Sequence, residues 1–246
     1  MARQSRLPAF LLTRPAFQGD RFAAALRNRF GDDIQIVESP LLAPRFLISE
    51  IPQMRIRALV FTSETGVQAF ARISAESGIK TIFTAWCVGD RTAQAARSLG
   101  LNAISSGGDA TDLATAIIAS GQAGPVLHLR GQDARGNLSE TLTSAGIETH
   151  SLVCYAQDAQ PFSSAACMLL GAKSPVVLPL FSPRTAGLFV EQAATTAVNA
   201  PIWVAAMSPS VAEVADRLHP KQLVIATRPD ADAMIEAVKD LIAAGE

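Results

Sequence analysis

Four segments of this 246-residue chain occur twice, in the same order and at nearly one spacing. FTSETGVQAF from Phe61 resembles LFSPRTAGLF from Leu180, which places Ser63 and Ser182 119 residues apart. WCVGDRTAQAA and AAMSPSVAEVA share that offset, while GDATDLATAI and PDADAMIEAV are 121 residues apart and FLLTRP and VLHLRG 116. Each match alone is weak, so the shared offset is the evidence. It predicts two domains of one fold that arose by duplication.

Short apolar runs alternate with amphipathic stretches along the chain. The predicted strands are 10–13, 34–37, 58–62, 85–88, 126–129, 148–155, 176–181, 202–206 and 223–226. The predicted helices are 20–30, 65–75, 91–99, 111–119, 135–145, 185–194, 210–218 and 231–243. Gly31, Gly100 and Gly146 follow helices and precede strands, as C-cap glycines do. Near-continuous apolar strands alternating with helices predict an α/β fold, with parallel sheets covered by helices on both faces.

The repeats permit two domain arrangements. One is a plain tandem that divides near residues 121–124. The other is a swapped arrangement, in which the first strand and helix join the second set of repeats. Two linker-like stretches, one with Pro40, Pro44 and Pro52 and one beginning at Pro161, favour the swapped arrangement. It would divide the chain into residues 1–38 with 158–246 and residues 39–157.

Charge and composition exclude several classes of protein. Hydrophobic residues make up 49% of the chain, which excludes a disordered ground state. Lysine and arginine total 21 against 22 acidic residues, so a net charge of −1 gives no basic field for nucleic acid or an anionic membrane. No apolar run approaches the roughly 20 residues of a membrane span, and no secretory signal is recognisable.

The three cysteines, Cys87, Cys154 and Cys167, are odd in number and show no close pairing. This pattern is typical of free thiols in a reducing compartment, and it predicts a cytoplasmic protein.

Familiar catalytic motifs are absent. The chain has neither a G-x-G-x-x-G nor a P-loop sequence after a strand, and no nucleophile elbow. Its histidines at 128, 150 and 219 are too dispersed for a metal site. His128 lies inside a predicted strand, and we interpret it as a core or sheet-edge histidine.

The candidate functional residues are small hydroxyls and arginines at the ends of predicted strands. In a parallel α/β domain these positions lie at the carboxyl edge of the sheet, where helix N-termini favour anionic ligands. Ser and Thr there are also ordinary helix N-caps, and the two roles are compatible. The candidates are Thr62, Ser63, Thr92, Ser182 and Ser210, the strand-end arginines Arg14 and Arg130 with Arg135, and Tyr155, the single tyrosine of the chain.

Together these segments resemble the uroporphyrinogen-III synthase family. The matching pieces are LLTRP, VFTSETGV, CVGDRTAQAA, GGDATDLA, VLHLRGQDARGNL, VCYAQ, LFSPRTAGLF and AAMSPSVAEVA, which span residues 11–216 in the family's order. The resemblance implies two similar α/β domains joined by two connecting segments, in the swapped arrangement, with hinge closure between them.

The resemblance also implies a cofactor-free, metal-free lyase that cyclises hydroxymethylbilane. Water is lost, and ring D is inverted through a spiro-pyrrolenine. Such a reaction depends on folding a flexible tetrapyrrole more than on strong acids or bases. A monomer is implied, with a transient contact to hydroxymethylbilane synthase as a further candidate partner. The alternatives are a catalytically degenerate homologue and a two-lobed binding protein for small anions.

Carried over by position, Tyr155 matches the family tyrosine that assists departure of the hydroxyl. Thr62, Ser63 and Thr92 match cleft-lining hydroxyls of one domain, and Ser182 and Ser210 those of the other. Two positions depart from the family pattern. Ser208 stands where a glycine is usual before the proline, and Val211 stands where a second hydroxyl is common.

Overall fold

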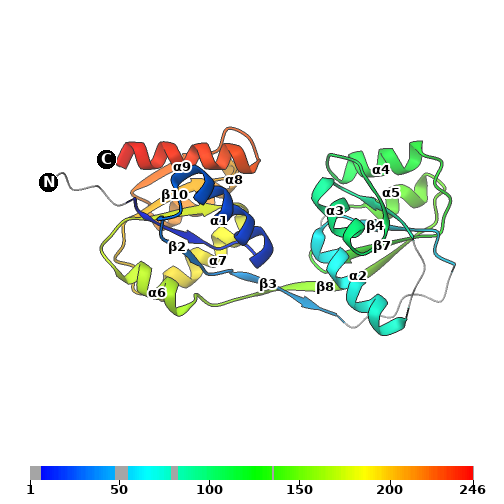
Figure 1. The fold of residues 1–246 in the computed structure, drawn as a ribbon, viewed down its shortest axis with the longest axis horizontal. Coiled ribbons are helices and arrows are strands. Elements are labelled where there is room, and N and C mark those ends of the chain that lie inside the picture. The colour runs from blue at the N-terminus through cyan, green and yellow to red at the C-terminus, as the bar shows by residue number, and fades with distance from the viewer. Residues whose placement is uncertain (1–6, 48–54, 79–82, 135, 246) are drawn as a thin grey trace. The chain divides into compact units, whose positions relative to one another are not determined.

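The computed structural model of the chain describes residues 7–47, 55–78, 83–134 and 136–245. The chain divides into two compact units, each with its own sheet. Unit 1 consists of residues 1–43 and 158–246, and unit 2 of residues 44–157. In Figure 1 unit 1 carries the blue and the yellow-to-red segments, and unit 2 the cyan-to-green ones.

The sheet of unit 1 has five strands in the order β11-β10-β9-β1-β2. Every neighbouring pair in it is parallel. The strands are β1 (Ala9–Leu12), β2 (Ile36–Glu38), β9 (Val176–Leu180), β10 (Ile202–Ala206) and β11 (Gln222–Ile225).

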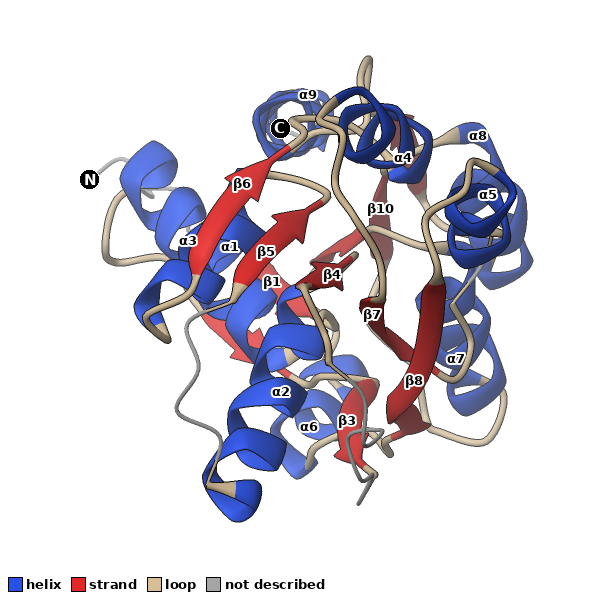
Figure 2. Ribbon diagram, turned by 90° about the vertical axis from the view of Figure 1, so that its right-hand side faces the viewer, coloured by secondary structure: helices blue, strands red, loops and turns tan. Residues whose placement is uncertain are grey.

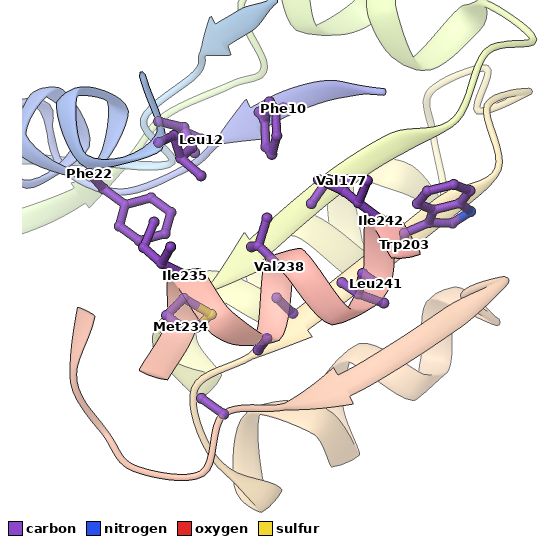
Figure 3. Packing of buried hydrophobic residues seen from close by; sticks show 14 of the residues in the cluster. Phe10, Leu12, Phe22, Val177, Trp203, Met234, Ile235, Val238, Leu241 and Ile242 are labelled. Carbon is purple, nitrogen blue, oxygen red and sulfur yellow. The ribbon is translucent and has the colours of Figure 1, made fainter. Parts of the chain in front are cut away.

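Helices cover both faces of the unit 1 sheet because its inner strands are apolar on both sides. The helices are α1 (Ala16–Phe30), α6 (Ser164–Gly171), α7 (Pro183–Ala193), α8 (Pro209–Ala215), η1 (Asp216–Leu218) and α9 (Ala231–Gly245). Alternate residues of β1 point to opposite faces, so Phe10 packs with α1 and α9 while Leu11 packs with α6, α7 and α8. Figure 3 shows Val238 and Leu241 of α9 in the first of these cores.

The sheet of unit 2 has six strands in the order β3-β8-β7-β4-β5-β6. The strands are β3 (Leu42–Phe46), β4 (Ala58–Phe61), β5 (Thr84–Cys87), β6 (Asn102–Ser105), β7 (Val126–Gly131) and β8 (Thr149–Ala159). The helices are α2 (Glu64–Ser77), α3 (Asp90–Ser98), α4 (Ala110–Ala119) and α5 (Leu138–Ser144). Helices α2 and α3 pack on one face of the sheet and α4 and α5 on the other (Figure 2).

The two sheets share one topology, which is the structural form of the sequence repeat. The repeats equate β1 with β7, β9 with β4 and β10 with β5. The order β11-β10-β9-β1-β2 then reads as β6-β5-β4-β7-β8, with β3 added at the edge of unit 2. Ser63 and Ser182, equivalent in the repeat, each begin the helix that follows the equivalent strand.

The α/β class is confirmed, with sheets in which parallel strand pairs dominate and helices flank both faces, and most predicted elements are present. Gly31, Gly100 and Gly146 have φ values of +94°, +81° and +86°, the left-handed region in which glycine ends a helix. Three elements, β3, β6 and α6, were not predicted from the sequence. Strand β3 (LAPRF) contains a proline, β6 has only four residues, and α6 (SAACMLLG) is apolar without a helical period.

The chain passes from unit 1 to unit 2 inside β3 and returns inside β8. These two strands are neighbours in the unit 2 sheet, so both crossings lie in hydrogen-bonded structure. Within the described ranges, none of the helices combines the length and the apolar character that crossing a membrane requires.

Candidate functional site

A cavity of about 270 Å³ opens at the carboxyl edge of the unit 2 sheet, where β4 and β7 end. Four of the nine candidate residues line it: Thr62, Ser63, Arg130 and Tyr155. They come from three neighbouring strands that are far apart in the sequence. The parallel arrangement brings their ends to one edge, as the sequence analysis predicts for strand-end residues.

Ser63 is held in the cavity by its role as the N-cap of α2. Its backbone is extended, with φ −158°, and its Oγ accepts a hydrogen bond from the Gly66 amide at 3.1 Å. Gly66 lies close to β7, because a Cβ at this position would lie 3.0 Å from the Leu129 carbonyl oxygen. The first turn of α2 is therefore packed against β7, and the hydroxyl of Ser63 faces the cavity with Tyr155.

Tyr155 reaches the cavity through an irregularity between β7 and β8. Arg130 pairs with Val153 and Gly131 pairs with Tyr155, so β8 has one extra residue at this point. Bulges of this kind turn a side chain toward a different direction, often beside active sites. The phenol oxygen of Tyr155 lies 2.9 Å from Ser63 Oγ.

Gly131 provides the space in which the Tyr155 ring lies. A Cβ on Gly131 would come within 2.7 Å of Cε2 and Cζ of Tyr155 and 3.0 Å from its hydroxyl oxygen. Real Cβ atoms do not approach other atoms so closely. The absence of a side chain at Gly131, the residue after Arg130, therefore leaves the room in which the Tyr155 ring lies.

Burial raises the pKa of the Tyr155 phenol, and the Ser63 hydrogen bond and the Arg130 cation oppose this shift without cancelling it. The phenol therefore keeps its proton at neutral pH. Ser63 Oγ already accepts the Gly66 amide proton and still has a proton of its own to donate. When Ser63 donates to Tyr155, the phenol proton is left for a ligand in the cavity.

Arg130 spans the loop that follows β7. Its Nη2 donates to the Ala134 carbonyl at 2.8 Å, and its Nε donates to the Gly131 carbonyl at 3.4 Å. A guanidinium has five N–H donors, so these two bonds leave donors for an anion. The side chain thus fixes the loop and supplies positive charge to the cavity.

His128 also lines this cavity and is a residue that the sequence analysis did not assign to the site. It is 5% exposed, in agreement with a core histidine. Its Nδ1 lies 3.1 Å from Ser139 Oγ, and that oxygen lies 2.7 Å from Ser151 Oγ. The sequence signal that could have placed His128 in the site is its spacing from Arg130, because residues 128 and 130 of one strand face the same side of the sheet.

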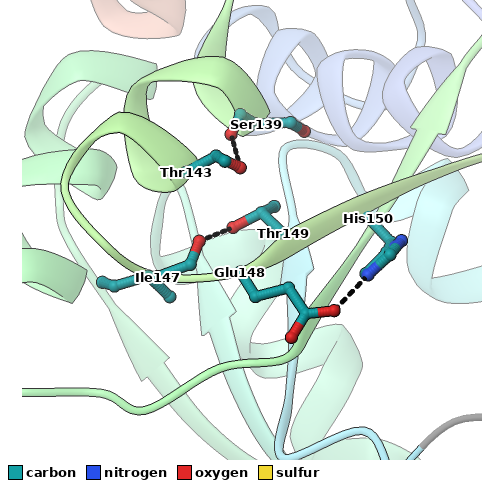
Figure 4. A network of polar contacts seen from close by, with 6 residues as sticks. All are labelled: Ser139, Thr143, Ile147, Glu148, Thr149 and His150. Atoms are coloured by element: carbon teal, nitrogen blue, oxygen red, sulfur yellow. Dashed lines mark hydrogen bonds and ion pairs between the residues drawn. The ribbon is translucent and has the colours of Figure 1, made fainter.

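Histidine 150 provides a contrast on the same sheet. Its side chain is 41% exposed, and its Nε2 lies 2.9 Å from Glu148 Oε1 (Figure 4). The same view shows Ser139 in the first turn of α5, where its carbonyl accepts a hydrogen bond from the Thr143 hydroxyl. Ser139 is therefore held by its helix while its own hydroxyl contacts His128.

Two predicted residues of this unit are not placed in the cavity. Thr92 lies in the first turn of α3 and is 5% exposed, but it does not line this cavity. Arg135 lies outside the described residues. Over residues 7–47, 55–78, 83–134 and 136–245, histidine, cysteine and carboxylate side chains form no group of three or more that could hold a metal ion.

Comparison with protein families decides what this chain is related to. The model described as uroporphyrinogen-III synthase HemD matches residues 20–236, which is most of the chain. The chain belongs to the uroporphyrinogen-III synthase family. The resemblance found in the sequence is thereby confirmed.

A solved structure of a uroporphyrinogen-III synthetase supports the same fold. The Helicobacter pylori uroporphyrinogen-III synthetase crystal structure aligns with a TM-score of 0.64 at 15% identity, covering 96% of this chain and all of that one. A mutant Thermus thermophilus uroporphyrinogen III synthase aligns with a TM-score of 0.48 at 14% identity, covering 96% of this chain and 99% of that one. Comparison with curated proteins gave no match.

In this member of the uroporphyrinogen-III synthase family, the remaining candidates lie at the carboxyl edge of unit 1. Arg14 follows β1, and its guanidinium carbon lies 3.8 Å from the centroid of the Phe181 ring. Ser182 caps α7, where its Oγ accepts from the Thr185 amide at 3.2 Å and donates to the Thr185 hydroxyl at 3.0 Å. Ser182 therefore follows the same capping pattern as Ser63.

The two departures from the family pattern lie at the start of α8. Ser208 is the N-cap residue, with φ −158°, and its Oγ lies 3.0 Å from Ser210 Oγ. Its extended backbone is one that any residue adopts, so glycine is not required for conformation. Val211 is 1% exposed and belongs to the core on the α7 and α8 side of the sheet.

Proposed function

We propose that this chain is a uroporphyrinogen-III synthase, which cyclises hydroxymethylbilane with loss of water and inversion of ring D. The observation that carries the proposal is the cavity at the carboxyl edge of unit 2. There a protonated phenol, Tyr155, is hydrogen-bonded to Ser63 beside the Arg130 cation. Membership of the family makes this edge the place to expect the substrate.

In the proposed first step, Tyr155 assists departure of the substrate's terminal hydroxyl. The pyrrole nitrogen supplies the electron pair that expels the hydroxyl. The hydroxyl takes up a proton and the nitrogen gives one up, so one water leaves and an azafulvene remains. The pKa of Tyr155 is raised by burial, so its O–H is present at neutral pH to donate to the departing oxygen.

In the following steps, the azafulvene carbon is attacked by the substituted carbon of ring D. The bond between ring D and its former methylene bridge then breaks, that methylene carbon bonds to the free α-carbon of ring D, and this α-carbon loses its proton, which leaves ring D inverted. These steps depend on a folded substrate more than on strong acids or bases, so proximity and orientation supply most of the advantage over spontaneous closure. The small number of titratable groups lining the cavity fits this requirement.

Recognition of the substrate rests on its carboxylates. We assign Arg130, Thr62 and Ser63 to carboxylate binding in unit 2, together with the first-turn amides of α2. Thr92 and Arg135 are proposed as further contacts of this unit. From unit 1 we propose Arg14, Ser182 and Ser210, which lie at or near the carboxyl edge of its sheet.

The remaining parts of the proposal concern the setting of the reaction. We propose a lyase that needs neither cofactor nor metal and works as a cytoplasmic monomer. The product of hydroxymethylbilane synthase is its substrate, and a transient contact between the two proteins is proposed for that reason. Analytical ultracentrifugation of the two proteins, separately and mixed, tests the monomer and the contact.

The activity itself is tested by a coupled assay. Hydroxymethylbilane is generated enzymatically, the protein is added, and the type I and type III uroporphyrin isomers are separated after oxidation. A predominance of type III is expected, since spontaneous closure gives type I. Type I alone, with folded protein and confirmed substrate, would overturn the proposal and favour a catalytically degenerate homologue that binds without turnover.

A further inference from the structure

His128, one of the residues lining the cavity of unit 2, has a ring nitrogen with no partner among the described residues. His128 Nε2 is buried and makes no hydrogen bond there. A buried polar group without a partner costs free energy, so such an atom beside a cavity points to a ligand. The ring comes from β7, two residues before Arg130 and on the same face of the sheet.

The ring is held in place from its other side. Ser139 Oγ lies 3.1 Å from Nδ1 and 2.7 Å from Ser151 Oγ. Ser151 pairs with His128 in the register of β7 and β8, so the three residues form a chain of contacts across two strands and α5. If Ser151 donates to Ser139 and Ser139 donates to Nδ1, the ring proton is on Nε2.

When an anion is present, the surrounding residues favour hydrogen bonds that run from Ser151 to Ser139 to His128 Nδ1. Arg130 supplies a positive charge, and Ser63 marks the N-terminus of the 14-residue helix α2, which attracts negative charge. Glu140 is the one carboxylate among the residues lining the cavity, and it is exposed. An anion that enters this space accepts hydrogen bonds, so it stabilises the tautomer with a proton on Nε2.

Burial, with a smaller effect from Arg130, lowers the pKa of His128 to about 4, while Glu140 acts in the opposite direction. The ring is therefore neutral at physiological pH. A neutral imidazole has one N–H donor and one acceptor. When Nδ1 accepts a hydrogen bond from Ser139, Nε2 carries the proton and is the hydrogen-bond donor of a neutral ring.

We propose that His128 Nε2–H binds one carboxylate arm of the tetrapyrrole substrate at the inner end of the unit 2 cavity. The inference rests on the proposed function and adds to it a specificity residue. The cavity of about 270 Å³ is below the size usual for sites that enclose a drug-sized ligand. It therefore suits an acetate or propionate arm, while the pyrrole rings stay outside with Tyr155.

The first test reads the tautomer and the binding by NMR on the full chain with ¹⁵N-labelled histidine. The probe is porphobilinogen, a monopyrrole with one acetate and one propionate arm, and the control is pyrrole. We expect the Nε2–H tautomer at His128. Its signals should shift when porphobilinogen is added and should not shift when pyrrole is added. His150 and His219, which do not line the cavity, are internal controls.

The second test is kinetic, with melting temperatures to establish that each variant is folded. We expect His128→Leu to raise KM for hydroxymethylbilane about tenfold or more, as for loss of a hydrogen bond to a charged group, with kcat changed less than threefold. His128→Gln, whose amide can place an N–H near Nε2, should restore KM to within threefold. His150→Leu is the matched control and should leave both constants unchanged.

The outcomes separate this inference from the proposed function. If the chain makes type III isomer but His128 shows no shift and His128→Leu leaves KM unchanged, the function stands and the inference is overturned. The Nδ1–H tautomer with porphobilinogen bound overturns it too. If only type I forms, the function fails, and the titration alone decides whether His128 binds carboxylates. If His128→Leu does not fold, the titration and His128→Gln decide.

Discussion

The two units place an arginine at the same point of the same topology and surround it differently. In unit 1, Arg14 follows β1 and stacks on the ring of Phe181. In unit 2, Arg130 is the penultimate residue of β7 and holds the following loop through the Ala134 carbonyl. The position two residues earlier is Leu12 in one unit, packed in the core, and His128 in the other. The two units share one sheet topology, and they differ in the residues that surround this arginine at the sheet edge.

The difference between Leu12 and His128 predicts unequal stability of the units in acid. His128 has a pKa of about 4 when folded, against about 6.5 when unfolded. Between these values the unfolded state binds more protons, so the free energy of unfolding of unit 2 falls as pH falls from 6.5 to 4, by about 3 kcal/mol. In His128→Leu this part of the pH dependence should disappear.

The two tryptophans allow the units to be followed separately, since Trp86 lies in unit 2 and Trp203 in unit 1. Urea unfolding of the Trp203→Phe variant reports on unit 2, and that of the Trp86→Phe variant reports on unit 1. Two results would contradict the attribution of this effect to His128. The first is an equal loss of stability in both units between pH 6.5 and 4, and the second is a loss in unit 2 that His128→Leu does not change.

Tyr155 lies in unit 2, and removing its hydroxyl tests whether the chemistry lies there. Tyr155→Phe keeps the ring against Gly131 but loses the contact with Ser63 and the donor for the departing hydroxyl. We expect kcat to fall about 100-fold, a usual effect of losing a positioned proton donor, with the melting temperature nearly unchanged. Unaltered kinetics in the coupled assay would remove Tyr155 from the mechanism.

A pair of glycines compares positioning in the two units. Gly131→Ala places a methyl group against the Tyr155 ring, whereas a Cβ at Gly187 in α7 of unit 1 meets nothing within 4 Å. We expect Gly131→Ala to lower turnover about tenfold or more, because small displacements of a catalytic group are costly. Gly187→Ala should leave turnover unchanged and slightly raise the melting temperature. Equal effects of the two variants would show that the contact with Tyr155 does not matter.

Removing two serine caps, one in each unit, has the smallest expected effect. Ser63 caps α2 in unit 2 and Ser163 caps α6 in unit 1, each accepting a backbone amide hydrogen bond. Ser63→Ala and Ser163→Ala should each lower the free energy of unfolding by about 1 kcal/mol. Only Ser63→Ala should also lower turnover, because only Ser63 contacts Tyr155. Urea unfolding and the coupled assay measure the two effects.

The sequence was sufficient to predict the α/β class. The hydrophobic periods of strands and helices can be read within short segments, and the repeat is supported by several segments with nearly one offset. It was insufficient for β3, whose proline-containing LAPRF forms a strand by pairing with β8, a contact distant in sequence. The same holds for α6, because a short apolar helix buried against a sheet has no amphipathic period. Elements defined by tertiary contacts were those missed.

For the site, the position of a residue at a strand end predicted which side chains meet at the edge of unit 2. Ser63 and Arg130 were found in this way, since parallel strands end at one edge, whereas Tyr155 lies inside β8, which continues to Ala159. The role of Gly131 was not predictable, because it depends on an extra residue in β8 that changes the register. His128 was missed because a histidine inside a strand is ordinarily part of the core, and the missing partner of its Nε2 among the described residues is a property of the folded structure.

The two chain crossings inside β3 and β8 have a consequence for synthesis. Unit 2 is one continuous segment, so all of its residues have been synthesised once residue 157 has been added. The sheet of unit 1 places β1 between β2 and β9, and β9 begins at residue 176. During translation the first strand and helix must therefore wait for the last third of the chain. The unit that contains the N-terminus is the last to be completed.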